Sequence, residues 1–254
     1  MRLTDSQYER IAPLLPTPRG KLTVPQRQVM DALFYIAKEG CSWRGLPPEF
    51  GPWHTIYMRL NRWAKAGVLE RVVTELQRDQ LAGLELDALS LDSTIIKLHA
   101  DGAGALRKRG GQAIGRSRGG LSSKLHALVG DERTALIIGL SPGQRGDAPA
   151  GRELLRRLGP VAGRPALIMD RAYHGDQTRQ LARDLGYRPV VPPPSYRNPS
   201  WSYDRDLYRR RNEVERFFCR LKRFRRIATR YDKLDLIFLS FIHLALIWDA
   251  LQLL

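Results

Sequence analysis

The sequence predicts a small all-helical domain over residues 1–80, followed by an α/β domain over residues 81–254. In the first part, apolar residues recur at helical spacing between prolines and glycines. In the second part, apolar runs of strand length alternate with helical stretches, an order typical of α/β proteins. With 254 residues, 43% of them hydrophobic, the chain is long enough to bury a core in such domains.

Proline and glycine mark the ends of the helices expected in the first part. Apolar residues follow the helical period in each of them. Pro25 is suited to open a helix, and Gly40 and Gly67 are suited to close one. Helices are expected from Thr4 to Pro16, from Pro25 to Gly40 and over 53–66.

Short helices joined by tight turns, with a basic last helix, favour a helix-turn-helix-like unit that binds DNA. In that interpretation Arg59 and Arg62, which lie off the apolar face of the third helix, contact DNA. The pattern is weakly specific, so a generic three-helix bundle with a solvated basic face stays open as the alternative.

Strand and helix patterns in the second part follow the order three strands, helix, strand, helix, strand, helix. The last helix is rich in Leu, Ile and Phe, but charged residues interrupt it, so it is expected to be a core helix rather than a membrane anchor. Strands are expected over 89–96, 125–130, 134–140, 166–170 and 188–191, and helices over 151–158, 175–185, 205–226 and 234–254.

Residues 102–120 are rich in Gly and Arg and have no periodicity, so they are expected to form a mobile basic loop. The loop lacks the Gly–Lys–Ser/Thr ending of a P-loop, which argues against nucleotide binding. Arg116 and Arg118 are candidates for contacts with a DNA backbone. A disordered basic loop without a partner is compatible with the same pattern.

A formal charge of +16 indicates an anionic partner such as a phosphate backbone. The first residues lack the charged-then-apolar pattern of a signal peptide. The two cysteines, Cys41 and Cys219, have no metal-ligand spacing and suggest no disulfide framework. We therefore expect a cytoplasmic protein that uses neither a membrane nor a small-molecule substrate.

Three acids stand out by position: Asp92 at or near the end of a strand, Asp170 directly after an apolar strand, and Glu215 on a basic helix. Acids beside apolar runs lose solvation, and a bound cation would compensate for that loss. Carboxylate oxygens favour Mg²⁺ or Mn²⁺. Lower-ranked competitors, also near expected element ends, are Asp87, Asp147 and Asp176.

The helix expected over 205–226 places a carboxylate among cations and a phenol. At about 100° per residue, four side chains fall within roughly 60° on one helix face. The alternative is that Arg211 and Glu215 form only a solvated i,i+4 salt bridge with no role in function. The four side chains are Tyr208, Arg211, Glu215 and Lys222.

This spacing resembles the Y-x2-R-x3-E-x6-K signature of insertion-sequence DDE transposases, and the segments around Asp92, Asp170 and Glu215 look like those of the insertion sequence 5 family in bacteria. The stretch 41–53, CSWRGLPPEFGPW, looks like the helical module that precedes the catalytic domain there. The resemblance covers nearly the whole chain. It implies an RNase H-like core with a mixed five-stranded sheet flanked by helices, and two-metal DNA cleavage and strand transfer.

Under this resemblance Asp92, Asp170 and Glu215 are the catalytic metal ligands for two ions of Mg²⁺ or Mn²⁺ per active site. Arg211 and Lys222 contact phosphates near the scissile bond, and Tyr208 positions that strand. Only 44 residues separate Asp170 from Glu215, which leaves no room for the β-rich insertion of larger relatives. Further DNA-binding candidates are Arg216, Arg220, Arg223, Arg59, Arg62, Arg116 and Arg118.

The implied partner is double-stranded DNA, as terminal inverted repeats of a transposon and as target DNA. The chain is expected to be at least a dimer when DNA-bound, and to be associated with the nucleoid. Two alternatives stay open: a non-catalytic DNA-binding regulator derived from a transposase, and an RNase H-like nuclease.

Overall fold

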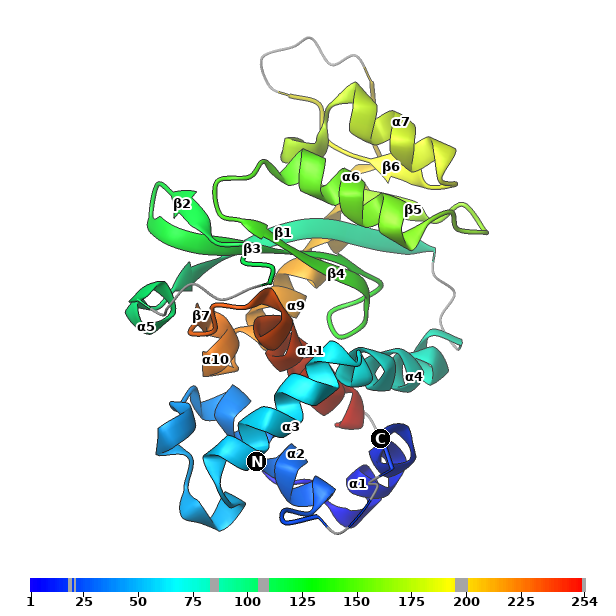
Figure 1. Ribbon diagram of the computed structural model, residues 1–254. Helices are drawn as coiled ribbons and strands as arrows, with labels where there is room; N and C mark the ends of the chain where they lie inside the picture. The colour runs from blue at the N-terminus through cyan, green and yellow to red at the C-terminus, as the bar shows by residue number, and fades with distance from the viewer. Residues whose placement is uncertain (18–19, 21, 83–86, 105–109, 195–200, 253–254) are drawn as a thin grey trace. The chain divides into compact units, whose positions relative to one another are not determined.

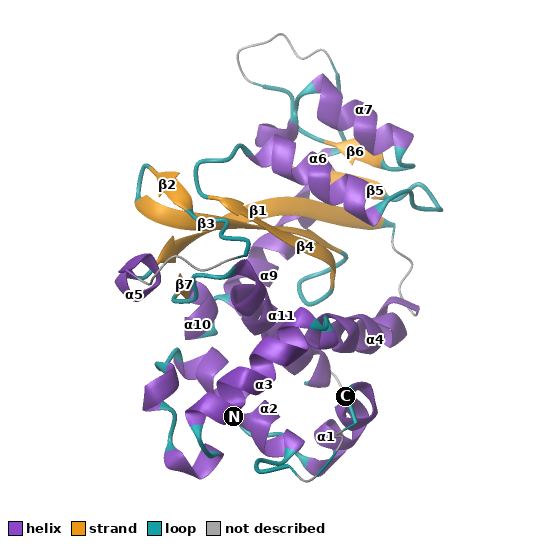
Figure 2. Ribbon diagram, viewed as in Figure 1, coloured by secondary structure: helices purple, strands orange, loops and turns teal. Residues whose placement is uncertain are grey.

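The contacts of the chain group it into two units, each described by itself below. A computed structural model describes residues 1–17, 20, 22–82, 87–104, 110–194 and 201–252 (Figure 1). One unit, called the helical unit, comprises residues 1–82, 98–112 and 221–254. The other, called the sheet unit, comprises residues 83–97 and 113–220. The predicted combination of a helical part and an α/β part is confirmed (Figure 2).

The C-terminal helix α11 (Asp235–Leu251) packs against α2, α3 and α4 in the helical unit. Its buried side chains, among them Phe238, Phe241 and Leu244, form the centre of this unit. The predicted core helix is therefore confirmed, and within the described residues no helix is long and apolar enough to cross a membrane. The unit also contains α1 (Asp5–Ile11), α2 (Gln26–Glu39), α3 (Trp53–Lys65), α4 (Val68–Ala82), α5 (Ala100–Gly104), α10 (Arg225–Ala228) and the short strand β7 (Thr229–Arg230).

Local sequence explains where the N-terminal helices start and stop. Thr4 and Gln7 form a reciprocal capping box at the start of α1. Gly40 ends α2 in the left-handed conformation, with φ 68°. A Cβ there would lie 2.9 Å from the Arg225 Cβ, so glycine is also needed for close packing. The three predicted helices are confirmed, and α4 is an additional helix.

The sheet unit contains a mixed sheet with both parallel and antiparallel neighbours. Strand β1 (Ala88–Leu98) lies between β3 (Gly120–Val129), which is antiparallel to it, and β5 (Ala166–Met169), which is parallel. β4 (Ala135–Pro142) pairs antiparallel with β3, and β6 (Arg188–Val190) pairs parallel with β5. The mixed five-stranded sheet that the resemblance implies is present, with a short extra strand, β2 (Gly115–Ser117), beside β3.

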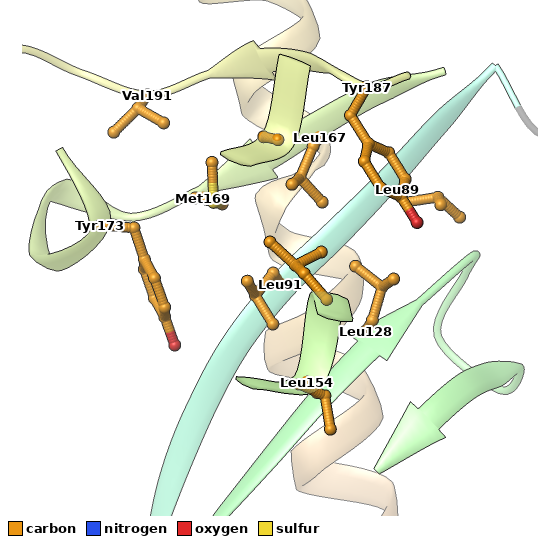
Figure 3. Packing of buried hydrophobic residues seen from close by; sticks show 11 residues of the cluster. Leu89, Leu91, Leu128, Leu154, Leu167, Met169, Tyr173, Tyr187 and Val191 are labelled. Carbon is orange, nitrogen blue, oxygen red and sulfur yellow. The ribbon is translucent and has the colours of Figure 1, made fainter. Parts of the chain in front are cut away.

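Alternate residues of β1 and β5 face opposite sides of the sheet. Leu89 and Leu91 pack under α6 (Asp147–Leu158) and α7 (Asp176–Asp184), in a cluster with Leu154 and Tyr173 (Figure 3). On the other face, Ala88, Ala166 and Ile168 contact residues around α8 (Arg205–Tyr208). Helices thus cover both faces of the sheet, as expected for a sheet with parallel strands.

Two local expectations are wrong. Asp92 lies in the middle of β1 rather than near its end. The segment over 205–226 is not one helix: it comprises α8, a 3-10 turn at Arg209–Arg211, α9 (Asn212–Leu221) and α10. No proline or glycine signals these breaks. The turn after α9 lets Phe224 and Arg226 become buried in the helical unit, each with 4% exposure.

The predicted loop over 102–120 is partly structured, because it contains the end of α5 and the strand β2. Residues 105–109 lie outside the described residues. The division into domains at residue 80 stays a prediction.

Candidate active site

The pairing of β1 with β5 brings two of the predicted acids together. The last pair in the parallel register is Leu91 with Met169. Asp92 and Asp170 each follow directly, so their backbones are neighbours where β5 ends. Both continue the face that carries Ala88 and Ile168, the face covered by α8. Carboxyl ends of parallel strands are where open α/β sheets place their binding sites.

Arg211 connects the third acid to this pair. Its Nη1 donates to Asp92 Oδ2 at 2.8 Å, and its Nη2 donates to Glu215 Oε1. The 3-10 turn before α9 positions Arg211, and Glu215 follows one turn later in α9. The Asp92 side chain is 15% exposed and that of Glu215 is 54% exposed. The site is therefore buried at Asp92 and exposed to solvent at Glu215.

Asp92 and Asp170 hold their protons more strongly than free carboxylates do. Burial raises the pKa of Asp92 to about 6; the charges of Asp170 and Asp147 add to the rise, and the Ser93 N–H and Arg211 oppose it. Burial also raises the pKa of Asp170, against the Ala172 N–H and Arg211. The groups around Asp92 and Asp170 therefore do not fully compensate the negative charge of these two carboxylates.

The donor chemistry fits a divalent cation, because Asp92 and Asp170 offer hard oxygen ligands side by side. Among the residues that the structure describes, no three carboxylate, imidazole or thiol side chains are arranged to hold a metal ion together. Glu215 instead contacts Arg211. For Glu215 to bind the same ion as the two aspartates, it would have to give up its contact with Arg211.

Asp147, ranked low from the sequence, is the first residue of α6, and its charge adds to the rise in the pKa of Asp92 and of Asp170. Its Oδ1 accepts from Ser93 Oγ at 2.7 Å and from Lys124 Nζ at 2.9 Å. Burial raises the pKa of Asp147, but these two donors outweigh it and lower the pKa overall. Ser93 follows Asp92 in β1, so this second polar group lies on the opposite face of the same strand.

The other two competing acids have structural partners. Asp87 accepts from Arg210 Nη1 at 2.9 and 3.0 Å. Asp176 begins α7, as its sequence position suggested, and pairs with Arg179. Neither contacts the group formed by Asp92, Asp170 and Glu215.

Tyr208, at the end of α8, packs beside the site. Its ring centroid lies 5.5 Å from that of Tyr203, and both contact the sheet face that carries Ala166. Burial raises the pKa of the Tyr208 phenol, with Arg211 opposing and the charge of Asp170 adding to the rise. Tyr208 and Arg211 are thus brought to the acids.

Most of the predicted DNA-contacting cations lie elsewhere on their units. Arg216 on α9 forms an ion pair with Glu132 at 2.7 Å. Arg59 on α3 lies over the Trp63 ring at 5.8 Å. Lys222 falls after the end of α9, so it does not share one continuous helix with Tyr208. The remaining candidates are Arg62 on α3, Arg116 and Arg118 at β2, Arg220 on α9, and Arg223 in the turn that follows.

Comparison with known families finds two matches that together span almost the whole chain. Residues 3–73 match the family described as "Putative transposase of IS4/5 family", and residues 84–249 match "Transposase DDE domain".

Relatives share about a third of the aligned residues. The chain is 37% identical over 131 residues to "Putative transposase for insertion sequence element IS6501" of Brucella ovis; the match covers 50% of this chain and 98% of that protein. It is 37% identical over 114 residues to the uncharacterised protein y4sN of Sinorhizobium fredii, covering 43% of this chain and 87% of that protein.

Among solved structures, two complexes of the Mos1 transposase are similar. The "paired-end complex with left transposon end" has a TM-score of 0.28 and 13% identity, and covers 72% of this chain. The "paired end complex with Mn" has a TM-score of 0.27 and 12% identity, and covers 73% of this chain. The matched parts span 62% and 65% of those chains, less than two thirds of each.

Proposed function

The chain belongs to the DDE-domain transposases of the IS4/5 family, and we propose that it binds the terminal inverted repeats of a transposon, cleaves the ends and joins the 3′ ends to target DNA. The observation that carries this proposal is the register of β1 and β5, which makes Asp92 and Asp170 neighbours beside Glu215 and Arg211. The family match and the positive charge of the chain support DNA as the substrate.

Asp92, Asp170 and Glu215 are the proposed catalytic and metal-binding residues. Two divalent ions, Mg²⁺ or Mn²⁺, would stabilise the attacking and leaving oxygens of the phosphodiester when bound. The raised pKa values of Asp92 and Asp170 favour this assignment, because a cation between two such carboxylates would stabilise their charged forms.

Arg211 is the proposed phosphate-binding residue of the same site. Its guanidinium contacts Asp92 and Glu215, and when those carboxylates bind cations it would be released to donate two parallel hydrogen bonds to a phosphate. Tyr208, packed beside it, would hold the strand that carries this phosphate. Lys222, Arg216, Arg220 and Arg223 would contact the backbone on either side.

Recognition of the repeats is assigned to the helices of residues 1–80, with Arg59 and Arg62 as candidate contacts. Arg116 and Arg118 at β2 would contact the backbone. Pairing of two transposon ends requires more than one subunit, so at least a dimer would form on DNA.

The proposal is tested by replacing Glu215 with Gln, which keeps the shape of the side chain and removes its charge. The substrate is duplex DNA carrying the repeats that flank the protein's own gene, incubated with Mg²⁺, and cut positions are mapped. Glu215→Gln is expected to abolish end cleavage and leave DNA affinity within about twofold. Glu213→Gln is the matched control, because Glu213 is in the same helix but pairs with Arg210.

Cleavage of repeat ends by Glu215→Gln at the wild-type rate would contradict the assignment of the acids. Equal cleavage of random duplex by the wild-type protein would instead identify a nuclease. Binding to the repeats without any cleavage by the wild-type protein would identify a regulator.

A further inference from the structure

A cavity of about 420 Å³ lies wholly within the helical unit, among residues that the proposed chemistry does not use. The connection after α2, the start of α3 and the segment between α10 and α11 line it. The positions of these helices in the chain are shown in Figure 1. Its volume is in the range of pockets that bind small molecules, about 300–1,000 Å³. Four aromatic residues are among those that line it: Trp43, Trp53, Tyr57 and Tyr231.

Arg226 holds the floor of this pocket rigid. Its Nε and Nη2 donate to the two oxygens of Asp232 at 2.9 and 2.8 Å, and its Nη1 donates to the Cys41 carbonyl at 2.9 Å. Both charged residues are buried, with 4% and 8% side-chain exposure. Breaking such a pair by removing one partner is strongly destabilising, so the geometry of the floor is well determined.

The guanidinium of Arg226 also orders the rings around it. Its Cζ lies 5.1 Å from the Tyr231 ring centroid, 5.2 Å from that of Phe241 and 5.9 Å from that of Trp43. Trp43 in turn meets Tyr57 edge to face, with centroids 5.1 Å apart. The aromatic wall is therefore organised before any ligand enters, which lowers the entropic cost of binding.

The polar groups of the pocket carry both signs of charge. The carboxylate of Asp101 offers acceptors, and the buried Arg226–Asp232 pair and Lys233 are part of the same lining. A planar heterocycle with donors and acceptors on its edge matches such a lining better than a purely apolar ligand does. Nucleobases have this character, and their faces stack on aromatic side chains.

Cations flank the pocket at two points of the chain. Arg44 directly follows Trp43 and is exposed. Arg225 directly precedes Arg226; its side chain is 75% exposed, and its Nη1 lies 3.8 Å from Glu39 Oε2. These positions suit the phosphates on either side of a bound base. Charge complementarity therefore favours a nucleotide within a DNA strand as the occupant.

We propose that this pocket binds one unpaired nucleobase of the DNA on which the protein acts. The base must be unpaired, because in a duplex its faces are covered by stacking. The inference rests on the proposed function in that it takes DNA as the ligand, but it assigns a site separate from the acids.

The test compares two forms of one duplex in the absence of divalent cations, measured by fluorescence anisotropy. One form carries a short single-stranded extension with bases, and the other carries the same extension made abasic, so that the phosphates are equal. The wild-type protein is expected to bind the first about tenfold more tightly, within the range for stacking of a base on aromatic side chains.

Trp53→Leu and Tyr57→Leu are each expected to bring this ratio close to one while leaving affinity for the abasic form unchanged. Tyr8→Leu is the matched control: it removes an aromatic ring of the helical unit that packs under the Arg27 guanidinium, outside the pocket, and it should keep the full affinity ratio. Circular dichroism of each variant confirms that the helices remain folded, and two separate pocket variants guard against local unfolding of one.

Equal affinity of the wild-type protein for the two forms would overturn the inference while leaving DNA binding intact. The inference would also be overturned if both folded pocket variants still bound the extension with bases about tenfold more tightly than the abasic one, because the base would then bind elsewhere. If the wild-type protein bound no duplex at all, including one with the repeat ends, both the proposed function and this inference would be contradicted.

Discussion

Arg211 contributes one positive charge to a group of three carboxylates, and Asp92 is the most buried partner it contacts. Burial raises the pKa of Asp92 to about 6, above its ordinary value of 3.8. Folding therefore disfavours the ionised form of this side chain. That cost is absent below about pH 4 and is complete above about pH 6.

Asp92→Asn is accordingly expected to stabilise the metal-free protein at pH 7, by at most about 3 kcal/mol, since one pKa unit corresponds to about 1.4 kcal/mol. Loss of the contact with Arg211 will offset part of this gain. The difference in unfolding free energy between the variant and the wild type is measured by urea unfolding at pH 4 and pH 7. This difference should grow as the pH rises. A difference that does not change with pH would contradict the burial of an ionised Asp92.

Lys124 and Asp147 form an ion pair in which both side chains are largely buried, with exposures of 13% and 25%. Lys124→Met would leave the Asp147 carboxylate with only the Ser93 hydroxyl as donor, and would raise the pKa of Asp147. A double-mutant cycle with Asp147→Asn should give a coupling energy of about 1–3 kcal/mol at pH 7, measured by urea unfolding. A coupling energy near zero would show that the pair contributes little to stability.

At the scale of elements, α6 approaches the sheet closely because Gly151 has no side chain. A Cβ at this position would lie 2.5 Å from Tyr173 Cε1 and 3.1 Å from Leu91 Cδ2. Both contacts are shorter than ordinary packing distances, so the helix would have to move away from the strand that carries Asp92.

Gly151→Ala should therefore destabilise the fold by about 1–3 kcal/mol, although alanine favours helices over glycine by about 1 kcal/mol. Gly104→Ala in α5 is the control, because a Cβ there has nothing within 4 Å, and it should be neutral or slightly stabilising. Thermal unfolding compares the two. If the two substitutions changed stability equally, the distance between α6 and the sheet would not be limited by the contact at Gly151.

The element scale also shows where sequence patterns mislead. The spacing of Tyr208, Arg211 and Glu215 predicted one helix face, and the structure does bring all three to the same group of side chains. It does so through α8, a 3-10 turn and α9 rather than through one helix. Helical periodicity cannot reveal such breaks when no proline or glycine marks them.

At the scale of the whole molecule, the net charge of +16 predicts binding to DNA that depends steeply on salt. Each phosphate contact contributes a slope of about −0.9 in a plot of log affinity against log salt concentration. With six or more contacts, affinity should fall by about 10³ or more between 50 and 200 mM salt. Replacing both Arg116 and Arg118 by Gln should reduce the slope by about 2, measured by anisotropy over a salt series. An unchanged slope would remove these two residues from the DNA interface.

The sequence by itself determined the class of fold, the N-terminal helix boundaries, the family signature and the candidate acids. These are encoded locally: a proline or glycine limits the backbone, an apolar run matches one period, and Asp170 directly follows its strand. Tertiary structure decided the rest. It placed Asp92 mid-strand beside Asp170, brought Asp147 next to the site and enclosed the aromatic pocket around Arg226. Such features depend on strand register and on packing between segments far apart in the chain, which no local pattern specifies.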